Sequence, residues 1–384
     1  MADPKARAQA VDPSRYGINA HVARDAILES IASIDIRWLR VDVDWDQIEK
    51  QQRVFDWRAI DQMLATARRL GLSVFASVSY TPAWASGSAD RATPPRDPAL
   101  FHEFVRIFVE RHRNAIRAIG LWNEPNLRQF FNGSREQYLR EILLPGLQSV
   151  RQAAPELLIV GPDLSSSGDP IRDWLRPILQ AASSLLDVIS HHQYDGGDTV
   201  SGRVRAIEGL NDFLVAEGST RPLWITEIGW DRVSEAEQAS RLSEVMAAML
   251  ERPWWSKTFW YDSHGPRWGI LRDDQSPQAG APKPAFDAYR DVIAQGRAMP
   301  NFRHVVTLAY NRILLREPDS GGLESFNRAM NDGLTEAQLH EALLRSPEYA
   351  QRFPEASRAA RAKSKAGARR KGVGRRPAKR GRRA

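Results

Sequence analysis

Two glutamates lie in similar surroundings at widely separated points of the chain. Glu124 follows the apolar run 118–122 and its neighbour Asn123, and Glu227 follows the apolar run 222–226. A short apolar run of this kind predicts a buried strand, so each glutamate is expected at the C-terminal end of a strand. Two carboxyl groups brought together there can cut a glycosidic bond. Each can equally be an ordinary strand-end carboxylate, which is the alternative interpretation.

The chemistry that two such carboxyl groups support is well defined. Hydrolysis with retention of configuration needs them about 5–5.5 Å apart. One protonates the leaving oxygen and later activates water, while the other attacks the anomeric carbon. We expect the acid to keep its proton because partial burial and a neighbouring carboxylate raise its pKa. Asn123 directly precedes Glu124, where its amide can hydrogen-bond a sugar 2-hydroxyl.

The elements that must position these groups follow a regular rhythm. Apolar strand-like runs occupy 16–21, 36–43, 72–78, 118–122, 157–161, 186–192, 222–226 and 256–261. Most of them are separated by helical patterns, at 57–70, 100–113, 138–153, 171–182, 204–217, 235–250 and 284–295. This alternation predicts an α/β fold of parallel βαβ units, and eight of them predict a (β/α)8 TIM barrel. A doubly wound open sheet is the alternative.

Other candidate site residues stand at or just after predicted strands, where a barrel builds its active site. They are Arg40, Trp84, His192, Tyr194, Trp260 and Tyr261, with His21 and Asp44 as further candidates. The aromatic residues can stack on sugars or can be core, and Arg40 can be a structural ion pair across the barrel floor. His191 and His192 resemble a zinc pair, but neighbours on a strand point to opposite faces. No third ligand follows at a telling spacing, so no metal is expected.

Composition divides the chain into an acidic body and a basic tail. Residues 356–384 hold 13 of the 54 Lys and Arg and no acid, so the net charge of +7 becomes −6 for residues 1–355. The chain has 384 residues and no cysteine, which excludes disulfides and thiolate metal sites. We expect four segments: a flexible N-terminal segment 1–14, a barrel 15–297, a small helical domain 302–354, and a disordered Lys/Arg-rich tail 355–384.

The tail and the termini suggest partners and location. Residues 356–384 can bind a polyanion non-specifically, with strong salt dependence, or can simply be solvated. They contain no aromatic residue for base stacking, and the acidic body argues against a nucleic-acid binder. No apolar run approaches the roughly 18 residues of a membrane span, and residues 1–14 lack the apolar core of a secretory signal. A polysaccharide substrate would nevertheless indicate a location outside the cytoplasm.

Several motifs together resemble one known group of enzymes. They are Arg40-Val41-Asp42 with Trp45 and Glu49, Phe55-Asp56-Trp57, Trp122-Asn123-Glu124-Pro125-Asn126, Ser190 to Tyr194, Thr226-Glu227-Ile228-Gly229-Trp230, and Lys283-Pro284-Ala285-Phe286 with Tyr289. Over roughly residues 15–295 the chain resembles the clan A glycoside hydrolases. The nearest resemblance is to the family 39-like group with its bacterial endoglycosidase and β-xylosidase relatives.

The resemblance implies a role for several residues. Glu124 would be the acid/base and Glu227 the nucleophile of a retaining hydrolase that cuts β-glycosidic bonds in a polysaccharide or oligosaccharide without a cofactor. Asn123 would bind the 2-hydroxyl, Arg40 would hold the nucleophile ionised, and His192 and Tyr194 would line the site. The segment 262–268 matches no subsite. A non-catalytic carbohydrate-binding protein on the same barrel is the alternative.

The C-terminal helical region resembles a domain of unknown function, family 4214. The resemblance is carried by 308–314, Arg316-Glu317-Pro318-Asp319, Gly322-Leu323 and Ser346-Pro347-Glu348-Tyr349. Such domains accompany bacterial surface and carbohydrate-related proteins, which implies a polysaccharide context. A generic packing or spacer domain is the alternative, and the sequence does not indicate the oligomeric state.

Overall fold

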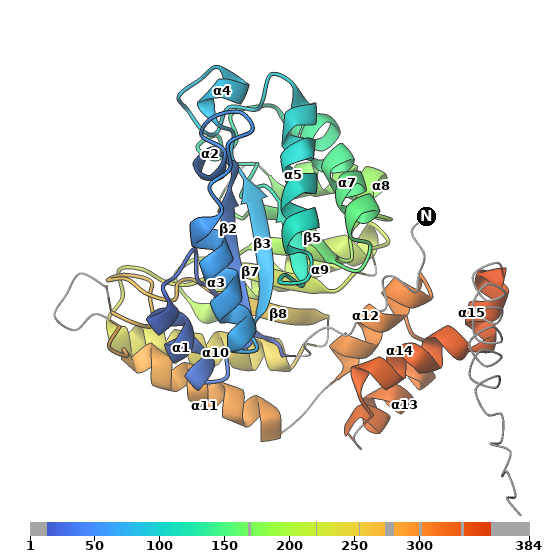
Figure 1. Ribbon diagram of the computed structural model, residues 1–384. Coiled ribbons are helices and arrows are strands. Elements are labelled where there is room, and N and C mark those ends of the chain that lie inside the picture. The colour runs from blue at the N-terminus through green and yellow to red at the C-terminus, as the bar shows by residue number, and fades with distance from the viewer. Residues whose placement is uncertain are drawn as a thin grey trace, which may run out of the picture.

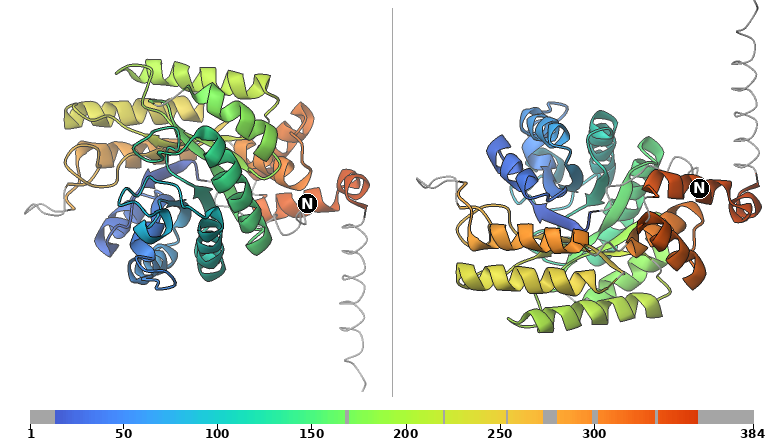
Figure 2. Two further views of the ribbon diagram at one scale, coloured as in Figure 1. Left: turned by 90° about the horizontal axis from the view of Figure 1, so that it is seen from above. Right: turned by 90° about the horizontal axis from the view of Figure 1, so that it is seen from below.

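Eight parallel strands close into a barrel. The computed structural model describes residues 14–167, 170–219, 221–252, 254–272, 280–298, 302–331 and 334–354. Each strand pairs with the next in sequence order, and β8 pairs with β1. The predicted TIM barrel is therefore confirmed, and the open-sheet alternative is wrong. Figure 1 shows the strands inside a layer of helices, and Figure 2 shows the same arrangement from above and below.

The strands lie close to the predicted runs. They are β1 (Tyr16–Asn19), β2 (Trp38–Asp44), β3 (Ser73–Ser79), β4 (Ala118–Leu121), β5 (Leu158–Ser165), β6 (Val188–His192), β7 (Leu223–Ile228) and β8 (Trp255–Trp260). The largest difference is in β5, which continues four residues beyond the predicted end at Gly161. This extension brings Asp163 into the barrel.

Helices follow the strands and cover the outside of the barrel. They are α1 (Asp25–Ser33), α2 (Trp45–Ile48), α3 (Arg58–Arg69), α4 (Ala83–Ser86), α5 (Pro98–His112), α6 (Arg135–Gln137), the π-helix η1 (Tyr138–Leu143), α7 (Leu144–Ala153), α8 (Ile171–Ala182), α9 (Val200–Ala216), α10 (Glu235–Leu250) and α11 (Pro284–Ala298). Helix α1 was not predicted, although Ile27, Leu28 and Ile31 form its buried stripe. Side-chain caps begin several helices; Asp97, for example, accepts the Ala99 N–H at the start of α5.

Side chains inside the barrel form layers. The lowest layer, which we call the barrel floor, is apolar and consists of Trp38, Phe75, Ala118, Leu158, Val160, Val188, Trp224 and Phe259. Alternate residues of a strand face the same side. Along β2, Arg40 therefore lies one layer above Trp38, and Asp42 lies one layer higher at the mouth. The polar groups are thus stacked above an apolar floor, at the end of the barrel where the strands terminate.

Four helices follow the barrel and pack together. They are α12 (Arg303–Ile313), α13 (Ser320–Asn331), α14 (Glu336–Arg345) and α15 (Pro347–Arg352). Their core includes Val306, Ile313 and Leu339. The helical region that the sequence predicted after the barrel is therefore confirmed. The group lies at the lower right of Figure 1, away from α2 and α4 at the top.

Parts of the predicted organisation lie outside the described residues. These are almost all of the N-terminal segment 1–14 and the whole tail 355–384. Within the described part of the chain, no helix combines the length and the apolar character needed to cross a membrane.

Candidate active site

The two glutamates are delivered by β4 and β7. Glu227 lies within β7, and Glu124 follows the end of β4. The backbone of Trp122 and Glu124 takes positive φ angles of 77° and 43°, a region that is unfavourable for side-chain-bearing residues. Hydrogen bonds hold this turn: the Glu124 N–H donates to the Asp163 carbonyl at 3.1 Å, and Trp122 Nε1 donates to the Phe130 carbonyl at 2.8 Å. The acid/base candidate is therefore fixed at the strand end.

The two carboxyl groups lie close together, with His192 between them. One oxygen of Glu124, one of Glu227 and a ring nitrogen of His192 all lie within 4.8 Å of one another. His192 Nδ1 is 2.9 Å from Glu124 Oε1 and 3.5 Å from Glu227 Oε1. All three residues are buried. The structure therefore brings together the pair of glutamates that the sequence suggested.

Arg40 lies beneath the two glutamates and binds Glu227, Asn123 and Asp163. Its NH1 donates to Glu227 Oε1 at 2.7 Å, and its NH2 donates to Asn123 Oδ1 at 2.7 Å. Both Nε and NH2 also contact Asp163 Oδ2, at 3.3 and 3.1 Å. Arg40 is thus part of the site and not only an ion pair at the floor. Because it binds the Asn123 oxygen, the amide NH2 of Asn123 is left for a ligand.

Several buried polar residues of this network were not predicted. Asp163 is fully buried between Arg40 and Thr226, whose hydroxyl donates to Asp163 Oδ1 at 2.6 Å. Asn19 and Ser77 also accept hydrogen bonds from Arg40, at 3.0 and 3.3 Å. The available signal was polar residues inside otherwise apolar strands. For Asp163 that signal was hidden because Gly161-Pro162 indicated the end of the strand.

The pKa directions of the two glutamates differ from the sequence-based expectation. For Glu124, burial raises the pKa, but the hydrogen bond and charge of His192 outweigh burial and lower it. For Glu227, burial raises the pKa and the charge of Glu124 raises it further, against the opposing effects of His192, Arg40 and Tyr194. The expectation of a raised pKa at Glu124 was wrong because it did not include a cationic partner.

His192 is that partner. Burial lowers its pKa, but the charge of Glu227 and the contacts with Asp163 and Glu124 raise it to about 9. His191, its neighbour on β6, instead has a pKa lowered to about 4, mainly by burial and by the charge of His192. His191 Nε2 contacts Gln193 Oε1 at 3.2 Å. The two histidines therefore have separate environments and do not form the pair that a zinc site would need.

Glu124, His192 and Glu227 also resemble the donor set of a metal site. Two carboxylates and an imidazole are ligands that several divalent metals accept. The guanidinium of Arg40 already binds Glu227 and places a positive charge beside it. The 2.9 Å contact between His192 Nδ1 and Glu124 Oε1 is also short enough for a proton to pass between these two groups.

Two of the predicted aromatic residues, Tyr194 and Tyr261, lie near Glu227, whereas Trp260 is part of the hydrophobic core. The Tyr194 hydroxyl donates to Glu227 Oε2 at 2.7 Å. Trp260 ends β8, is fully buried and packs against Trp230 at 6.0 Å between ring centroids. Tyr261 follows Trp260, and burial raises its pKa.

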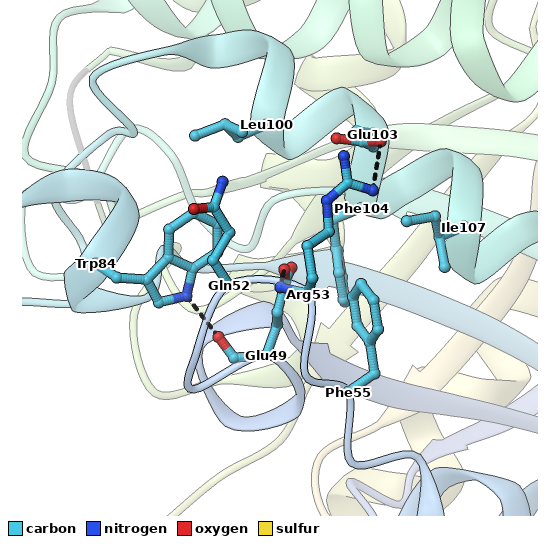
Figure 3. A pocket seen from close by; sticks show the side chains of 9 residues that line it. All are labelled: Glu49, Gln52, Arg53, Phe55, Trp84, Leu100, Glu103, Phe104 and Ile107. Carbon is cyan, nitrogen blue, oxygen red and sulfur yellow. Dashed lines mark hydrogen bonds and ion pairs between the residues drawn. The ribbon is translucent and has the colours of Figure 1, made fainter.

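Trp84 lies in a different environment. Its Nε1 donates to the Glu49 carbonyl at 2.7 Å, and its ring meets Trp45 edge-on at 5.7 Å. Figure 3 shows it beside Gln52 at a cavity of about 10 Å³, roughly the room that one water needs. None of these contacts involves the residues around the two glutamates, and a role of Trp84 in substrate binding stays a prediction.

Known proteins match both parts of the chain. Residues 22–210 match the family described as Glycosyl hydrolases family 39, and residues 298–353 match the domain of unknown function DUF4214. The first match includes Glu124 and ends before Glu227. A β-xylosidase from Caldicellulosiruptor saccharolyticus is 28% identical over 155 residues, which are 36% of this chain and 31% of that protein. The chain thus matches about a third of the length of this curated relative.

Solved structures share the fold at low identity. A family 39 glycoside hydrolase from Bacteroides cellulosilyticus matches with a TM-score of 0.57 and 19% identity, covering 74% of this chain and 65% of that one. A family 39 β-xylosidase from Caulobacter crescentus matches with a TM-score of 0.59 and 18% identity, covering 74% of this chain and 73% of that one. A family 5 subfamily 18 enzyme from Streptomyces cattleya, in complex with GlcNAc, matches with a TM-score of 0.60 and 18% identity. This match covers 86% of this chain and 93% of that one. At these identities the likeness shows the fold alone.

The sequence, fold and family comparisons agree with one another. The motifs around Glu124 and Glu227 lie at strand ends of one closed barrel. The family matches cover the first part of that barrel and the helices that follow it. The chain is therefore similar to the family 39 glycoside hydrolases over residues 22–210 and to the DUF4214 domain over residues 298–353.

Proposed function

We propose that this chain is a retaining glycoside hydrolase that cuts β-glycosidic bonds in a polysaccharide or oligosaccharide. The observation that carries the proposal is the pair Glu124 and Glu227, whose oxygens approach within 4.8 Å. Inverting enzymes need a wider gap, about 6.5–9.5 Å, to hold a water between the carboxyl groups. The names of the family 39 relatives support a β-glycoside as substrate.

Glu227 is the nucleophile of the first step. Its carboxylate forms a bond to the anomeric carbon while the bond from that carbon to the leaving oxygen breaks. Arg40 and Tyr194 each donate to Glu227, at 2.7 Å, and these bonds favour its ionised form against burial. They also fix the direction of the carboxylate, so that little reorganisation is needed when it attacks.

Glu124 supplies the proton to the leaving oxygen. In the free site the proton of the Glu124–His192 pair lies on the imidazole, since the pKa of Glu124 is lowered and that of His192 is raised to about 9. Their 2.9 Å contact lets His192 return this proton to Glu124. When Glu227 bonds to the anomeric carbon, its carboxylate is no longer charged. The pKa of His192 then falls, because the charge of Glu227 is one of the causes that raise it.

The second step reverses these roles. Glu124, now a carboxylate, takes a proton from a water molecule, and the water oxygen bonds to the anomeric carbon. The bond from that carbon to Glu227 breaks, which frees the nucleophile with net retention. Asn123, whose oxygen is held by Arg40, can donate its NH2 to the sugar 2-hydroxyl in both steps, an interaction that strengthens in the transition state.

The test is a comparison of active-site variants on a panel of neutral and charged β-glycans. Glu124→Gln and Glu227→Gln are expected to lower kcat at least about 1,000-fold, because each removes a reacting group. Azide added to Glu227→Gly is expected to restore turnover and to give a glycosyl azide of opposite anomeric configuration. Azide added to Glu124→Gly is expected to give a product of retained configuration.

The alternative is a carbohydrate-binding protein on a barrel that no longer catalyses. It would be indicated if no glycan is cut while some bind equally well to the unmodified chain and to both Gln variants. The reacting carboxylates, Asn123 and the Arg40 network argue against this alternative, since binding alone does not need two glutamates at this separation.

A further inference from the structure

Asp163 on β5 is a buried carboxylate to which the proposed reaction gives no role. Its Oδ2 accepts hydrogen bonds from Arg40 Nε and NH2 at 3.3 and 3.1 Å, and its Oδ1 accepts one from the Thr226 hydroxyl at 2.6 Å. Because Asp163 is only 1% exposed and both oxygens are bound by protein groups, it does not reach a sugar directly. An ionised group is costly to bury, so its charge needs a reason beyond filling space.

The backbone of Asp163 is bound to the elements on both sides of β5. Its carbonyl accepts the Glu124 N–H at 3.1 Å, and its N–H donates to Ser190 Oγ at 3.0 Å. The pairing of β5 with β6 is irregular between Gly161 and Leu164, and within this irregularity Asp163 takes a positive φ of 51°. Such a backbone is unfavourable for a residue with a side chain and persists where the surrounding contacts impose it.

The carboxylate of Asp163 faces the side of His192 that is turned away from Glu124. Asp163 Oδ2 is 3.7 Å from His192 Nε2, whereas Glu124 and Glu227 lie 2.9 and 3.5 Å from Nδ1. A distance of 3.7 Å is longer than a hydrogen bond, so Asp163 acts on the imidazole mainly through its charge. In a buried position, an opposite charge this close strongly favours the protonated imidazole.

Asp163 keeps its charge during the proposed reaction, whereas Glu227 does not. Burial raises the pKa of Asp163, but the charge of Arg40 and the contact with His192 outweigh burial and hold it well below its usual range. Glu227 becomes a neutral ester when it bonds to the anomeric carbon. Among the described residues, His192 then has Asp163 and Glu124 as its close anionic neighbours.

We propose that Asp163 is a positioning residue that keeps the shared proton on the Glu124–His192 pair and thereby sets the highest pH at which the site can protonate a leaving group. Asp163 gains and loses no proton itself. Its charge holds the proton on the pair, and its contacts with Arg40 hold the guanidinium that binds Glu227. The inference rests on the proposed function, because it takes this proton to be the one that reaches the leaving oxygen.

The other charged and titratable groups in this part of the barrel do not replace Asp163. Arg40 opposes protonation of His192, and His191 is neutral, because burial and the charge of His192 lower its pKa to about 4. Burial keeps a nearby phenol neutral by raising its pKa. Among the described residues, the groups that face His192 or Asp163 are Arg40 from β2, Glu124 after β4, Tyr138 from η1, His191 from β6 and Glu227 from β7.

Asp163→Asn removes the charge and keeps the shape of the side chain. Its carbonyl oxygen can accept from Arg40 while its NH2 donates to the Thr226 oxygen, since the Thr226 hydroxyl has another acceptor in the His191 carbonyl at 3.4 Å. We expect the basic limb of the pH profile of kcat/KM to move down by at least about one pH unit. The ratio of unmodified to variant activity should therefore grow about tenfold between pH 6 and pH 9. Asp163→Ser, a second neutral replacement, should give the same shift if Asp163→Asn does not fold.

A measurement without substrate separates this inference from the proposed function. The chain has 8 histidines, and His192→Gln identifies the ring signals of His192 in the NMR spectrum of the labelled chain. In the unmodified chain these signals should titrate at about pH 9, and in Asp163→Asn at least about one pH unit lower. If they titrate at the same pH in both chains, the inference is overturned while the proposed function stands. If they shift but the unmodified chain cuts no glycan of the panel, the proposed function fails and the inference falls with it.

Two controls separate lost charge from general disturbance. Asp187→Asn removes an equally buried carboxylate that Arg151 binds. Asp187 directly precedes β6 and is therefore roughly 16 Å along that strand from His192, so the variant should leave the His192 titration unchanged. Thr226→Val removes the hydroxyl that binds Asp163 but leaves the charge, so the basic limb should stay in place whatever happens to kcat. A control that moves the limb as far as Asp163→Asn does would show that the charge of Asp163 has no special role.

Discussion

His192 determines where the proton lies in this site. It is fully buried, and carboxylates approach both of its ring nitrogens: Glu124 at 2.9 Å and Glu227 at 3.5 Å from Nδ1, and Asp163 at 3.7 Å from Nε2. Three carboxylates around one imidazole explain why its protonated form is favoured despite burial. The acid of the proposed reaction is therefore a pair of residues that share one proton, and not an isolated glutamate with a raised pKa.

This arrangement predicts how stability depends on pH. The pKa of His192 is raised from the ordinary 6.5 to about 9, so its protonation stabilises the folded chain fully below pH 6.5. That stabilisation is lost as the pH rises from 6.5 through 9, and its size is on the order of 3 kcal/mol. Urea unfolding at a series of pH values should show the decline in the unmodified chain and roughly half of it in His192→Gln. The remainder comes from His21, whose pKa is raised to about 11, so that its stabilisation is lost over the same range.

A second histidine provides the control. Burial lowers the pKa of His102, so it is already neutral above pH 6.5 and His102→Gln should keep the decline of the unmodified chain. If His192→Gln declines as steeply as the unmodified chain, the imidazole does not hold the extra proton. The lowered pKa of Glu124 would then need a cause other than a protonated His192.

At the scale of elements, the loop after β8 depends on close contact with the end of β7. A Cβ atom at Gly229 would lie 2.2 Å from the Tyr261 carbonyl oxygen and 3.1 Å from Trp268 Cε3. Gly229→Ala should therefore push the loop away from β7 and destabilise the chain by about 1–3 kcal/mol. Because the same loop carries Trp268, which contacts the Tyr194 ring beside Glu227, kcat/KM should fall by about 100-fold.

Another glycine shows whether this loss is local. Gly209 lies within α9, and a Cβ atom there meets no other atom within 4 Å. Gly209→Ala should stabilise the chain by about 0.5–1 kcal/mol, since alanine favours the helix, with activity unchanged. Thermal unfolding and kcat/KM on the best substrate measure both effects. Equal activity in Gly229→Ala and Gly209→Ala would show that the loop position is unimportant.

Sequence patterns predicted the strand ends better than the contacts between them. The apolar runs before Glu124 and Glu227 were short and bounded by polar residues, so their ends were clear. Gly161-Pro162 concealed the continuation of β5 and with it Asp163, because these residues usually interrupt a strand. Helix α1 was missed in a short segment between two strands. The position of a proton depends on distances between side chains of different strands, and a linear pattern does not contain them.

At the scale of the whole molecule, the two ends of the barrel differ: one is the apolar floor and the other is the polar mouth. The mouth carries the glutamates and the aromatic rings of Tyr194 and Trp268 beside them. The floor is covered by α12, where Leu308 packs against the floor residues. The helical region was expected as a separate segment, 302–354, and its contact with the barrel could not be predicted from composition. This position places the DUF4214 helices at the end opposite to the proposed chemistry.

The contact between the two parts contains a buried charge, which predicts a cost for separating them. Arg312 of α12 is 1% exposed, donates to the Glu156 carbonyl at 3.0 Å, and has its Nε 3.9 Å from Asp187 Oδ1. Asp187 is also bound by Arg151 and directly precedes β6, whose last residue is His192. Arg312→Met should lower the free energy of unfolding by about 2 kcal/mol, because a buried carbonyl and carboxylate lose a cationic partner.

Arg345→Met is the matched control, since Arg345 is exposed on α14 and is paired only at the surface with Glu341; its effect should be below about 0.5 kcal/mol. Urea unfolding followed by both tryptophan fluorescence, which reports mainly the barrel, and far-ultraviolet circular dichroism should give coincident transitions in the unmodified chain. Arg312→Met should shift both together if α12 is part of the barrel's cooperative unit. Two separated transitions in the unmodified chain would instead show that the helices unfold independently, so that the floor contact contributes little to the stability of the active site.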